Sequence, residues 1–398
     1  MDKEFKVPAA EIHSRKKNIQ KAMQKENIDG LLILQRVDLF YFSGTSQNGV
    51  LYIPAEGEPL LFIKKYFPRA RKESTLANVI EMGSSREIPS IISDYFGKLP
   101  GIIGFEMDVL PVNNFRFYQG IFGNLKYVDG SPLILNIRMI KSEWDIEQMK
   151  KAAELGYKTF EFARSEIRPG LTEMEFAGMY EAFARKQGHQ GLLRTRNFLA
   201  EAYGWHILSG TSGGIVGLLD SPASGKGTSA AFPCGGSNKK LLANEPIMID
   251  LGSVLNGYHM DETRMFTIGP MPKREMAACM ATIEVQNAVL EKVKPGITVA
   301  ELFEVSESKA RSLGYEDQYL GPKGVKVSFI GHGIGLELVE HPVIAKGKDY
   351  RLEPGMTFAL EPKMVFENEF TAGIEDVFSV TETGYKMISK VPQKVFIC

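Results

Sequence analysis

The sequence predicts a two-domain protein in which an α/β domain is followed by a larger α+β domain, and three observations support this. The chain has 398 residues, well beyond the roughly 250–300 residues at which a single hydrophobic core stops growing. Helical and strand patterns alternate over residues 8–128, as in an α/β domain. The remainder carries a partial internal repeat, which is typical of a duplicated unit. We place the two domains at residues 1–135 and 140–398.

The first domain is predicted to be a small sheet covered by helices. Apolar residues recur at helical spacing over residues 8–26, and the apolar run 30–34 is typical of a buried strand. Turn residues at 55–59 separate the next two strands. The expected elements are a helix over 8–26, strands over 30–34, 49–53, 59–64 and 78–82, a helix over 88–97, a strand over 101–106, a helix over 110–121 and a strand over 125–128.

A domain boundary is expected near residues 129–145. The segment Asp129-Gly-Ser-Pro132 breaks the pattern there, and a long amphipathic helix follows Ser142, which is a good N-cap residue. Beyond the boundary, residues 168–172 (Arg-Pro-Gly-Leu-Thr) and 294–298 (Lys-Pro-Gly-Ile-Thr) each precede a helical stretch that ends at a glycine. The shared segment and its shared continuation indicate an internal duplication.

Composition and charge narrow the classes of function. Lys plus Arg is 47 and Asp plus Glu is 48, for a net charge of −1, so no whole-chain charge favours nucleic acid or an anionic membrane as a partner. No apolar run approaches the ~18–20 residues of a transmembrane helix, and the N-terminal segment lacks the apolar stretch of a signal peptide. The 3 cysteines show no CxxC spacing, which disfavours a disulfide scaffold or a thiolate zinc site. We therefore expect a cytoplasmic protein without nucleic-acid or membrane partners.

Two carboxylates come together on one predicted hairpin. Asn256-Gly257 lies between two extended runs and is the strongest short-range signal for a two-residue hairpin turn. That turn sets Asp261 opposite Gly252, so Asp250, two residues earlier, becomes its diagonal neighbour on the same face. Two half-buried carboxylates repel each other unless a cation or a proton lies between them. The alternative is a solvated hairpin with two unrelated acids.

Further acids and one histidine follow in the second copy of the repeat. His332 lies in a glycine-spaced apolar segment, Glu361 ends an apolar strand, and Glu375 with Asp376 begins another. Taken singly, each is more often structural, and a lone histidine of this kind is usually a hydrogen-bonded core residue. Together with the hairpin acids they form an oxygen-rich set that suits Mn²⁺, Co²⁺ or Fe²⁺. Such a set can hold two ions about 3.5–4 Å apart.

At these residues the sequence resembles the pita-bread metallohydrolases, the family of methionine aminopeptidase, prolidase, aminopeptidase P and creatinase. The resemblance covers nearly the whole chain, and the first domain is similar to that of prolidase, aminopeptidase P and creatinase. The segments that match the metal-ligand motifs of the family, in order, are Ile-Asp250-Leu-Gly, Gly257-Tyr-His-Met-Asp261, Gly331-His332-Gly-Ile-Gly-Leu, Leu360-Glu361-Pro and Ile374-Glu375-Asp376. The resemblance implies a pita-bread fold for the second domain and a homodimer.

The resemblance also implies a role for each ligand. Asp261 and Glu375 would bridge two divalent metal ions. Asp250 would chelate one of them, and His332 with Glu361 would complete the other. Glu361 would in addition accept a proton from a water held between the metals, which attacks the scissile carbonyl. The expected ions are Mn²⁺, Co²⁺, Fe²⁺ or Zn²⁺, with Mn²⁺ or Co²⁺ favoured.

The sequence departs from the family at three positions of the expected substrate pocket. Cys234 stands where the proline-specific enzymes often have histidine, Val339 replaces the histidine of a His-Glu-x-Pro motif, and Gly373 replaces an arginine of aminopeptidase P. We interpret Cys234 as a passive pocket residue, with a thiolate ligand or nucleophile as the alternative. His206 and His341 are candidate replacements for the missing proton donors, and a structural role is the alternative for each.

These observations lead to three hypotheses on function. The first is a dinuclear-metal hydrolase of the Xaa-Pro peptidase type, prolidase or aminopeptidase P, acting on a small peptide or amide. The second keeps the fold and changes the chemistry, because creatinase-like relatives cleave C–N bonds of small non-peptide substrates and others are lyases. The third is a non-catalytic peptide-binding module. Retention of all five ligands disfavours it, since a binding module has no need of four mutually repelling acids.

Overall fold

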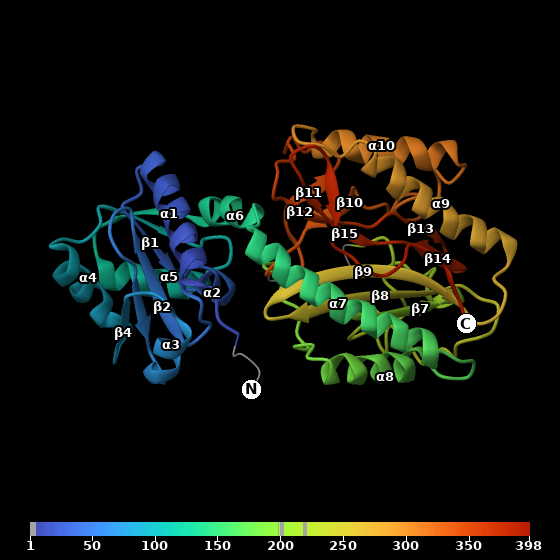
Figure 1. Cartoon of the computed structure of the whole chain (residues 1–398), viewed down its shortest axis with the longest axis horizontal. Helices are drawn as coiled ribbons and strands as arrows, with labels where there is room; N and C mark the ends of the chain where they lie inside the picture. Colours follow the sequence, from blue (N-terminus) through green and yellow to red (C-terminus); the bar gives the residue numbers. More distant parts are fainter. Residues whose placement is uncertain (1–4, 198, 200–202, 218–220) are drawn as a thin grey trace. The chain divides into compact units, whose positions relative to one another are not determined.

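The computed structural model describes residues 5–197, 199, 203–217 and 221–398. The chain divides into two compact units, Met1–Arg138 and Met139–Cys398 (Figure 1). Each unit has its own sheets and its own hydrophobic core. Within the described ranges, no helix combines the length and the apolar character needed to cross a membrane.

The first unit is built on a six-stranded mixed sheet. Its strands are β1 (Gly30–Ile33), β2 (Gly49–Pro54), β3 (Leu60–Ile63), β4 (Asn78–Glu81), β5 (Ile102–Phe105) and β6 (Lys126–Asp129). They follow the order β4-β3-β2-β1-β5-β6, with β1–β2 and β2–β3 antiparallel and the other pairs parallel. β1 lies inside this sheet and is buried along its whole length, which accounts for its unbroken apolar run.

Helices cover this sheet, as the alternating pattern predicts. The helices of this unit are α1 (Ala9–Lys25), α2 (Arg36–Ser43), α3 (Phe67–Glu73), α4 (Ile88–Phe96), α5 (Val112–Phe122) and α6 (Ser131–Met139), with a short 3₁₀ turn, η1 (Ser85–Glu87). Every strand and helix expected in this unit forms, with small shifts at the ends. The α/β class predicted for it is therefore confirmed.

The sequence patterns did not predict α2, α3 and α6 of the first unit, and each was missed for a local reason. α2 is buried along most of its length, so it lacks the polar face that marks a surface helix. It begins at the side-chain cap of Gln35 and ends at Gly44, which has a φ of 76°. α3 is short. The segment interpreted as a break starts α6, because Asp129 Oδ1 accepts hydrogen bonds from both the N–H and the hydroxyl of Ser131.

The described part of the second unit holds three sheets. The strands are β7 (Trp205–Ser209), β8 (Ile247–Leu255), β9 (Tyr258–Thr267), β10 (Phe329–Gly333), β11 (Glu340–Ala345), β12 (Thr357–Leu360), β13 (Lys363–Phe366), β14 (Phe370–Gly373), β15 (Asp376–Val380), β16 (Tyr385–Met387) and β17 (Phe396–Ile397). In the described residues they form a four-stranded sheet, β17-β9-β8-β7, a five-stranded sheet, β11-β10-β12-β15-β16, and the hairpin β13-β14.

Two pairs of helices pack on these strands. They are α7 (Glu143–Glu166) with α8 (Glu173–Lys186), and α9 (Lys273–Leu290) with α10 (Val299–Ser312); the short 3₁₀ turn η2 spans Gly210–Ser212. α7 packs on β8 and β9 and α8 on β7, whereas α9 packs on β14 and α10 on β11. Figure 1 shows α9 and α10 at the top of this unit and α8 at its bottom. Each copy of the repeat thus supplies one helix pair and its strands.

The two repeated segments fold alike. Thr172 caps α8 and Thr298 caps α10, and each forms a capping box with the glutamate three residues later. Just before each cap, Gly170 and Gly296 have φ values of 92° and 87°, a conformation that favours glycine. The N–H of each glycine donates to a leucine carbonyl, at 3.0 and 2.8 Å. The shared sequence therefore encodes a shared turn and helix start.

The hairpin register follows from its turn. Asn256 and Gly257 have φ values of 54° and 84°, the left-handed conformations that a primed turn requires. Across β8 and β9, Gly252 lies opposite Asp261. The predicted register is therefore confirmed, and Asp250 is the diagonal neighbour of Asp261.

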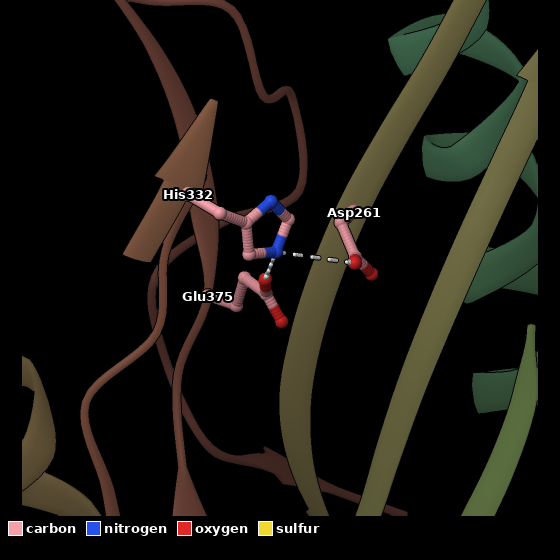
Figure 2. A group of neighbouring side chains, drawn as sticks. All are labelled: Asp261, His332 and Glu375. Carbon is pink, nitrogen blue, oxygen red and sulfur yellow. Dashed lines mark ion pairs between the residues drawn. The ribbon is translucent and has the colours of Figure 1, made fainter. Parts of the chain in front are cut away.

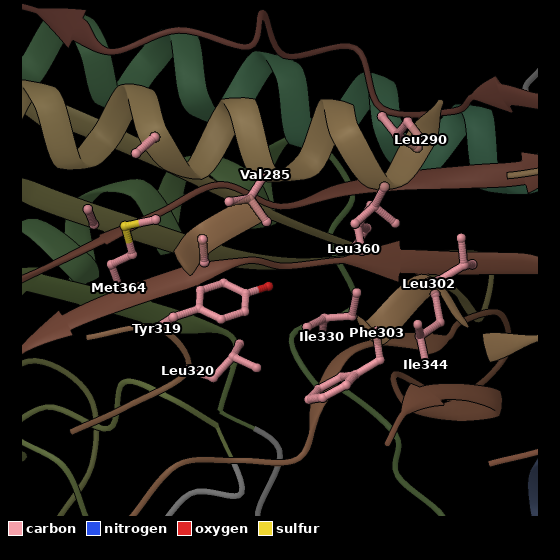
Figure 3. Close-up of a cluster of buried hydrophobic side chains, with 14 of the residues drawn as sticks. Val285, Leu290, Leu302, Phe303, Tyr319, Leu320, Ile330, Ile344, Leu360 and Met364 are labelled. Carbon is pink, nitrogen blue, oxygen red and sulfur yellow. The ribbon is translucent and has the colours of Figure 1, made fainter. Parts of the chain in front are cut away.

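The larger core of the second unit lies between α9, α10 and the five-stranded sheet (Figure 3). Its fully buried side chains include Val285, Leu302, Ile330, Ile344 and Leu360. Burying one side chain of this size contributes about 1.5–3 kcal/mol. Leu360 is the last residue of β12, so its packing fixes the strand end from which the next residue, Glu361, projects.

Candidate metal centre

Two sheets carry the residues of the expected site. Asp250 on β8 and Asp261 on β9 come from the hairpin. His332 lies on β10, and Glu361 and Glu375 lie where β12 ends and β15 begins. β12 pairs with both β10 and β15, so the last three side chains come from neighbouring strands.

Backbone pairing joins the two sheets at this point. The N–H of Thr263 on β9 donates to the carbonyl of Glu375 at 3.3 Å, and the N–H of Glu375 donates back to Thr263 at 3.2 Å. The hydroxyl of Thr263 also donates to Glu375 Oε2 at 2.9 Å. The buried Arg264 donates to the carbonyls of Thr263 and Glu375 at 2.8 and 2.7 Å, and it pairs with Asp376. These bonds fix the position of the Glu375 carboxylate.

The imidazole of His332 faces three carboxylates at distances that suit a shared cation. Its Nε2 lies 3.9 Å from Asp261 Oδ2, 3.7 Å from Glu361 Oε1 and 4.0 Å from Glu375 Oε1, and Figure 2 shows Asp261 and Glu375 approaching it from two sides. These separations are too long for hydrogen bonds. Ligand atoms about 2.0–2.2 Å from one ion can lie up to about 4.4 Å apart. The ligand atoms of Asp261, His332 and Glu375 all lie within 4.8 Å of one another, so these three residues could hold an ion, and Glu361 Oε1 lies beside them.

Two further features of the cluster fit a bound ion. His332 Nδ1 lies 3.0 Å from the carbonyl of Gly333, the kind of backbone bond that orients a metal-binding imidazole. Glu375 Oε1 is buried and has no hydrogen-bond partner among the described residues. A buried carboxylate oxygen without a donor is costly unless a cation or a proton satisfies it. The residues on the His332 side of the cluster therefore fit one divalent ion.

A lysine that sequence analysis missed lies inside the same cluster. Lys363 is the first residue of β13, and its side chain is 2% exposed. Its Nζ lies 2.7 Å from Glu361 Oε2, 3.0 Å from Asp250 Oδ2 and 3.6 Å from Glu375 Oε2. The lysine therefore contacts three of the four acids that the family resemblance assigns to metal ions.

Burial and charge shift the pKa values of the cluster in opposite directions. Burial, reinforced by neighbouring carboxylates, raises the pKa of Asp261 and of Glu375 well above the usual range. Burial also acts to raise the pKa of Asp250, but the charges of Lys363 and His206 and the hydrogen bonds from Lys363 and Thr263 together outweigh it, and the pKa is lowered. The surrounding acids raise the pKa of Lys363 against the effect of its burial. Lys363 thus stabilises the charged form of Asp250, whereas Asp261 and Glu375 need a further cation, or a proton, to offset the repulsion among the acids.

His206 and Cys234 lie on the Asp250 side of the site. His206 on β7 is opposite Asp250 on β8, and its ring lies 5.0 Å from that of Tyr203. Burial lowers the pKa of His206, although Asp250 opposes the shift. Cys234 is buried, and a Cβ at the following residue, Gly235, would lie 2.5 Å from the Tyr203 ring. His206, Tyr203 and Cys234 therefore lie near one another beside Asp250.

The remaining expected pocket residues occupy the five-stranded sheet and the β13-β14 hairpin. His341 lies on β11, the partner strand of β10, with its ring 5.5 Å from that of Tyr350. Val339, just before β11, is 44% exposed. Gly373 lies directly opposite Lys363 across β13 and β14. The glycine that replaces an expected arginine is therefore the cross-strand partner of the lysine that enters the cluster.

Comparison with known proteins is consistent with this arrangement. The model of the creatinase/prolidase N-terminal domain matches residues 15–140, and that of metallopeptidase family M24 matches residues 147–382. The architecture is thus a creatinase-type N-terminal domain followed by a pita-bread domain with a candidate metal centre. The chain belongs to metallopeptidase family M24.

Relatives match along almost the whole chain. The Xaa-Pro dipeptidase of Pyrococcus furiosus is 27% identical over 96% of this chain and 99% of its own length. A peptidase of Staphylococcus epidermidis is 28% identical over 94% of this chain and 98% of its own. Among solved structures, the prolidase from Pyrococcus furiosus has a TM-score of 0.77 at 26% identity, covering 94% of this chain and 99% of the other. The Xaa-Pro dipeptidase from Bacillus anthracis has a TM-score of 0.82 at 24% identity, covering 97% and 100%.

Proposed function

We propose that this chain is a metal-dependent Xaa-Pro peptidase, which hydrolyses the amide bond on the amino side of a proline. The observation that carries the proposal is the position of His332 Nε2, which lies 3.9, 3.7 and 4.0 Å from oxygens of three different acids. Relatives named Xaa-Pro dipeptidase that align over 96% of the chain support the substrate class.

The ion would be held by Asp261, His332, Glu361 and Glu375. Mn²⁺ or Co²⁺ suits this set of carboxylate oxygens and one imidazole nitrogen. When bound, a divalent ion of this kind polarises a carbonyl oxygen and lowers the pKa of water. Asp250, which the family resemblance assigns to a second ion, already has a cationic partner in Lys363 at 3.0 Å.

Glu361 is the proton acceptor that we assign to the reaction. Its Oε2 accepts a hydrogen bond from Lys363 at 2.7 Å, which fixes the carboxylate, and its Oε1 is directed toward His332. In hydrolysis, water adds to the scissile carbonyl and loses one proton, and that proton must reach the leaving proline nitrogen. A carboxylate held beside the carbonyl can accept and return it.

His206 is the stronger of the two candidate histidines for contacting substrate. It is opposite Asp250 and buried beside the cluster, whereas the ring of His341 packs near Tyr350. Burial lowers the pKa of His206, although Asp250 and a hydrogen bond to the backbone of Tyr203 oppose the shift, and the second nitrogen of a neutral ring can accept a hydrogen bond from a substrate N–H without adding charge. We assign His341 a supporting role in the wall of the pocket.

A hydrolysis panel tests the proposed function. The purified protein, stripped with chelator and reloaded with Mn²⁺ or Co²⁺, is assayed on Xaa-Pro dipeptides, longer Xaa-Pro peptides, matched Xaa-Ala peptides and small amidino compounds. We expect metal-dependent release of the N-terminal residue from Xaa-Pro substrates, and loss of this activity in Glu361→Gln. Cleavage confined to the amidino compounds, or no cleavage by the reloaded protein, would contradict the proposal.

Two expectations of the sequence analysis remain predictions. The family resemblance implies a homodimer, and light scattering after gel filtration measures that mass directly. A cytoplasmic location is tested by fractionating the source cells and probing for the chain.

A further inference from the structure

The position of Lys363 in the chain brings its side chain into the cluster. It begins β13 two residues after Glu361, and its side chain is 2% exposed. Burying an ammonium group is costly unless it is paired. Here Nζ meets Glu361 Oε2 at 2.7 Å, Asp250 Oδ2 at 3.0 Å and Glu375 Oε2 at 3.6 Å, so three carboxylates share one positive charge.

These contacts lie on the side of the cluster away from the imidazole. His332 Nε2 faces Glu361 Oε1 and Glu375 Oε1, whereas Lys363 Nζ faces the other oxygen, Oε2, of each carboxylate. Asp250, the acid assigned to a second ion, has its contact with Lys363. A second metal ion at Asp250 would have to approach the oxygens that Lys363 Nζ already contacts, and the two positive charges would repel each other there.

We propose that Lys363 is a built-in cation that takes the place of one of the two metal ions, so that the chain holds a single divalent ion on the His332 side. The inference rests on the proposed metal site, but it concerns the number of ions and not the reaction. The site would thus have one exchangeable cation and one that is covalently part of the protein. Asp250 serves as the counter-ion of Lys363 in this arrangement.

Gly373 provides independent support, because it makes room for the lysine. It lies opposite Lys363 across β13 and β14. A Cβ at this glycine would lie 2.9 Å from Lys363 Cγ and 3.4 Å from Met248 Sδ, so any larger residue displaces the lysine stem. The absence of a side chain at 373 and the entry of Lys363 into the cluster are therefore two parts of one arrangement.

Metal stoichiometry tests the proposal without reference to activity. The full-length protein is equilibrated with Mn²⁺, freed of excess ion, and analysed for metal per chain by mass spectrometry. We expect about one ion per chain in the wild type and about two in Lys363→Met, which keeps the length of the side chain and removes its charge. Lys346→Met, at an exposed lysine whose Nζ lies 3.9 Å from Glu307, is the matched control and should bind as the wild type does.

Electron paramagnetic resonance supplies a second readout. Mn²⁺ in the wild type should give the spectrum of an isolated ion, whereas Lys363→Met should show the exchange coupling of two neighbouring ions. If Lys363→Met does not fold, Gly373→Ala replaces it, because it displaces the lysine stem while keeping the charge; it should raise the second-ion affinity at least about tenfold over the wild type.

Two tightly bound, coupled ions in the wild type would overturn the proposal, as would a count of one in folded Lys363→Met. These results are independent of the proposed peptidase activity. A chain that binds one ion and cleaves no Xaa-Pro peptide would refute the function and leave this inference standing.

Discussion

Glu262 allows a quantitative test of how burial of a carboxyl group changes the stability of the second unit with pH. It follows Asp261 on β9, where its side chain is fully buried against α7. The packing is tight, since a Cβ at Gly156 would lie 2.5 Å from Glu262 Oε2. Burial raises the pKa of Glu262 to about 7 from an ordinary value of 4.5, with Arg264 opposing the shift. The substitution Glu262→Gln keeps the shape and removes the titration.

The sign of the effect follows from the raised pKa. The folded state binds the Glu262 proton more tightly than the unfolded state, so its contribution to stability is complete below about pH 4.5 and is lost as the pH rises through about 7. A shift of this size, at about 1.4 kcal/mol for each pKa unit, corresponds to about 3 kcal/mol. Relative to the wild type, Glu262→Gln should therefore gain about 3 kcal/mol between about pH 4 and about pH 8.

Urea unfolding followed by tryptophan fluorescence measures this difference. The chain has 2 tryptophans, Trp144 and Trp205, and both lie in the second unit, so the signal reports on that unit alone. Glu382→Gln, at an exposed position of the same unit, is the control and should follow the wild type at every pH. A difference between Glu262→Gln and the wild type that stays constant within about 1 kcal/mol across this pH range would refute the reasoning.

Three further predictions concern the site. Arg264→Met should destabilise the second unit by about 3–5 kcal/mol in the same urea assay, because it leaves the buried carboxylate of Asp376 without its cation; a loss below about 1 kcal/mol would contradict the proposed role. Glu361→Gln should lower kcat on Xaa-Pro peptides by at least about 100-fold, measured under metal saturation, because it removes the proton acceptor; an unchanged kcat would exclude that role. Val339→His should raise Xaa-Pro cleavage, since an exposed position accepts the larger ring. The buried Cys234 is a poor site for the same change, because overpacking there costs about 1–3 kcal/mol. Equal activities of Val339→His and the wild type would show that the missing histidine does not limit cleavage.

Much of the architecture was predictable from local signals. Asn256-Gly257 fixed the hairpin register because only a primed turn accommodates both residues between extended runs. The repeated Pro-Gly segments predicted two equivalent helix starts, since Thr172 and Thr298 are capping residues with a glutamate three positions on. α2 escaped prediction because burial on most sides erases helical periodicity.

The candidate site was only partly predictable, and Lys363 shows why. A lysine that follows a proline in a short strand usually has its side chain in solvent. Lys363 is buried here because Gly373 leaves room for it, and the two residues meet only through the pairing of β13 with β14. The absence of an arginine at 373 was visible in the sequence. The consequence of that absence was not visible, because the side chain that fills the space beside Gly373 is that of Lys363, which belongs to another strand.

The central claim is that His332 and three acids share one divalent ion beside the Lys363 ammonium. Crystals of the full chain grown with Mn²⁺, measured near the manganese absorption edge, test it directly by anomalous scattering. We predict one anomalous peak about 2.0–2.2 Å from His332 Nε2, with Asp261, Glu361 and Glu375 as its other protein ligands and Lys363 still bound to Asp250. No peak at His332, or a second peak at Asp250 with the lysine displaced, would contradict the account.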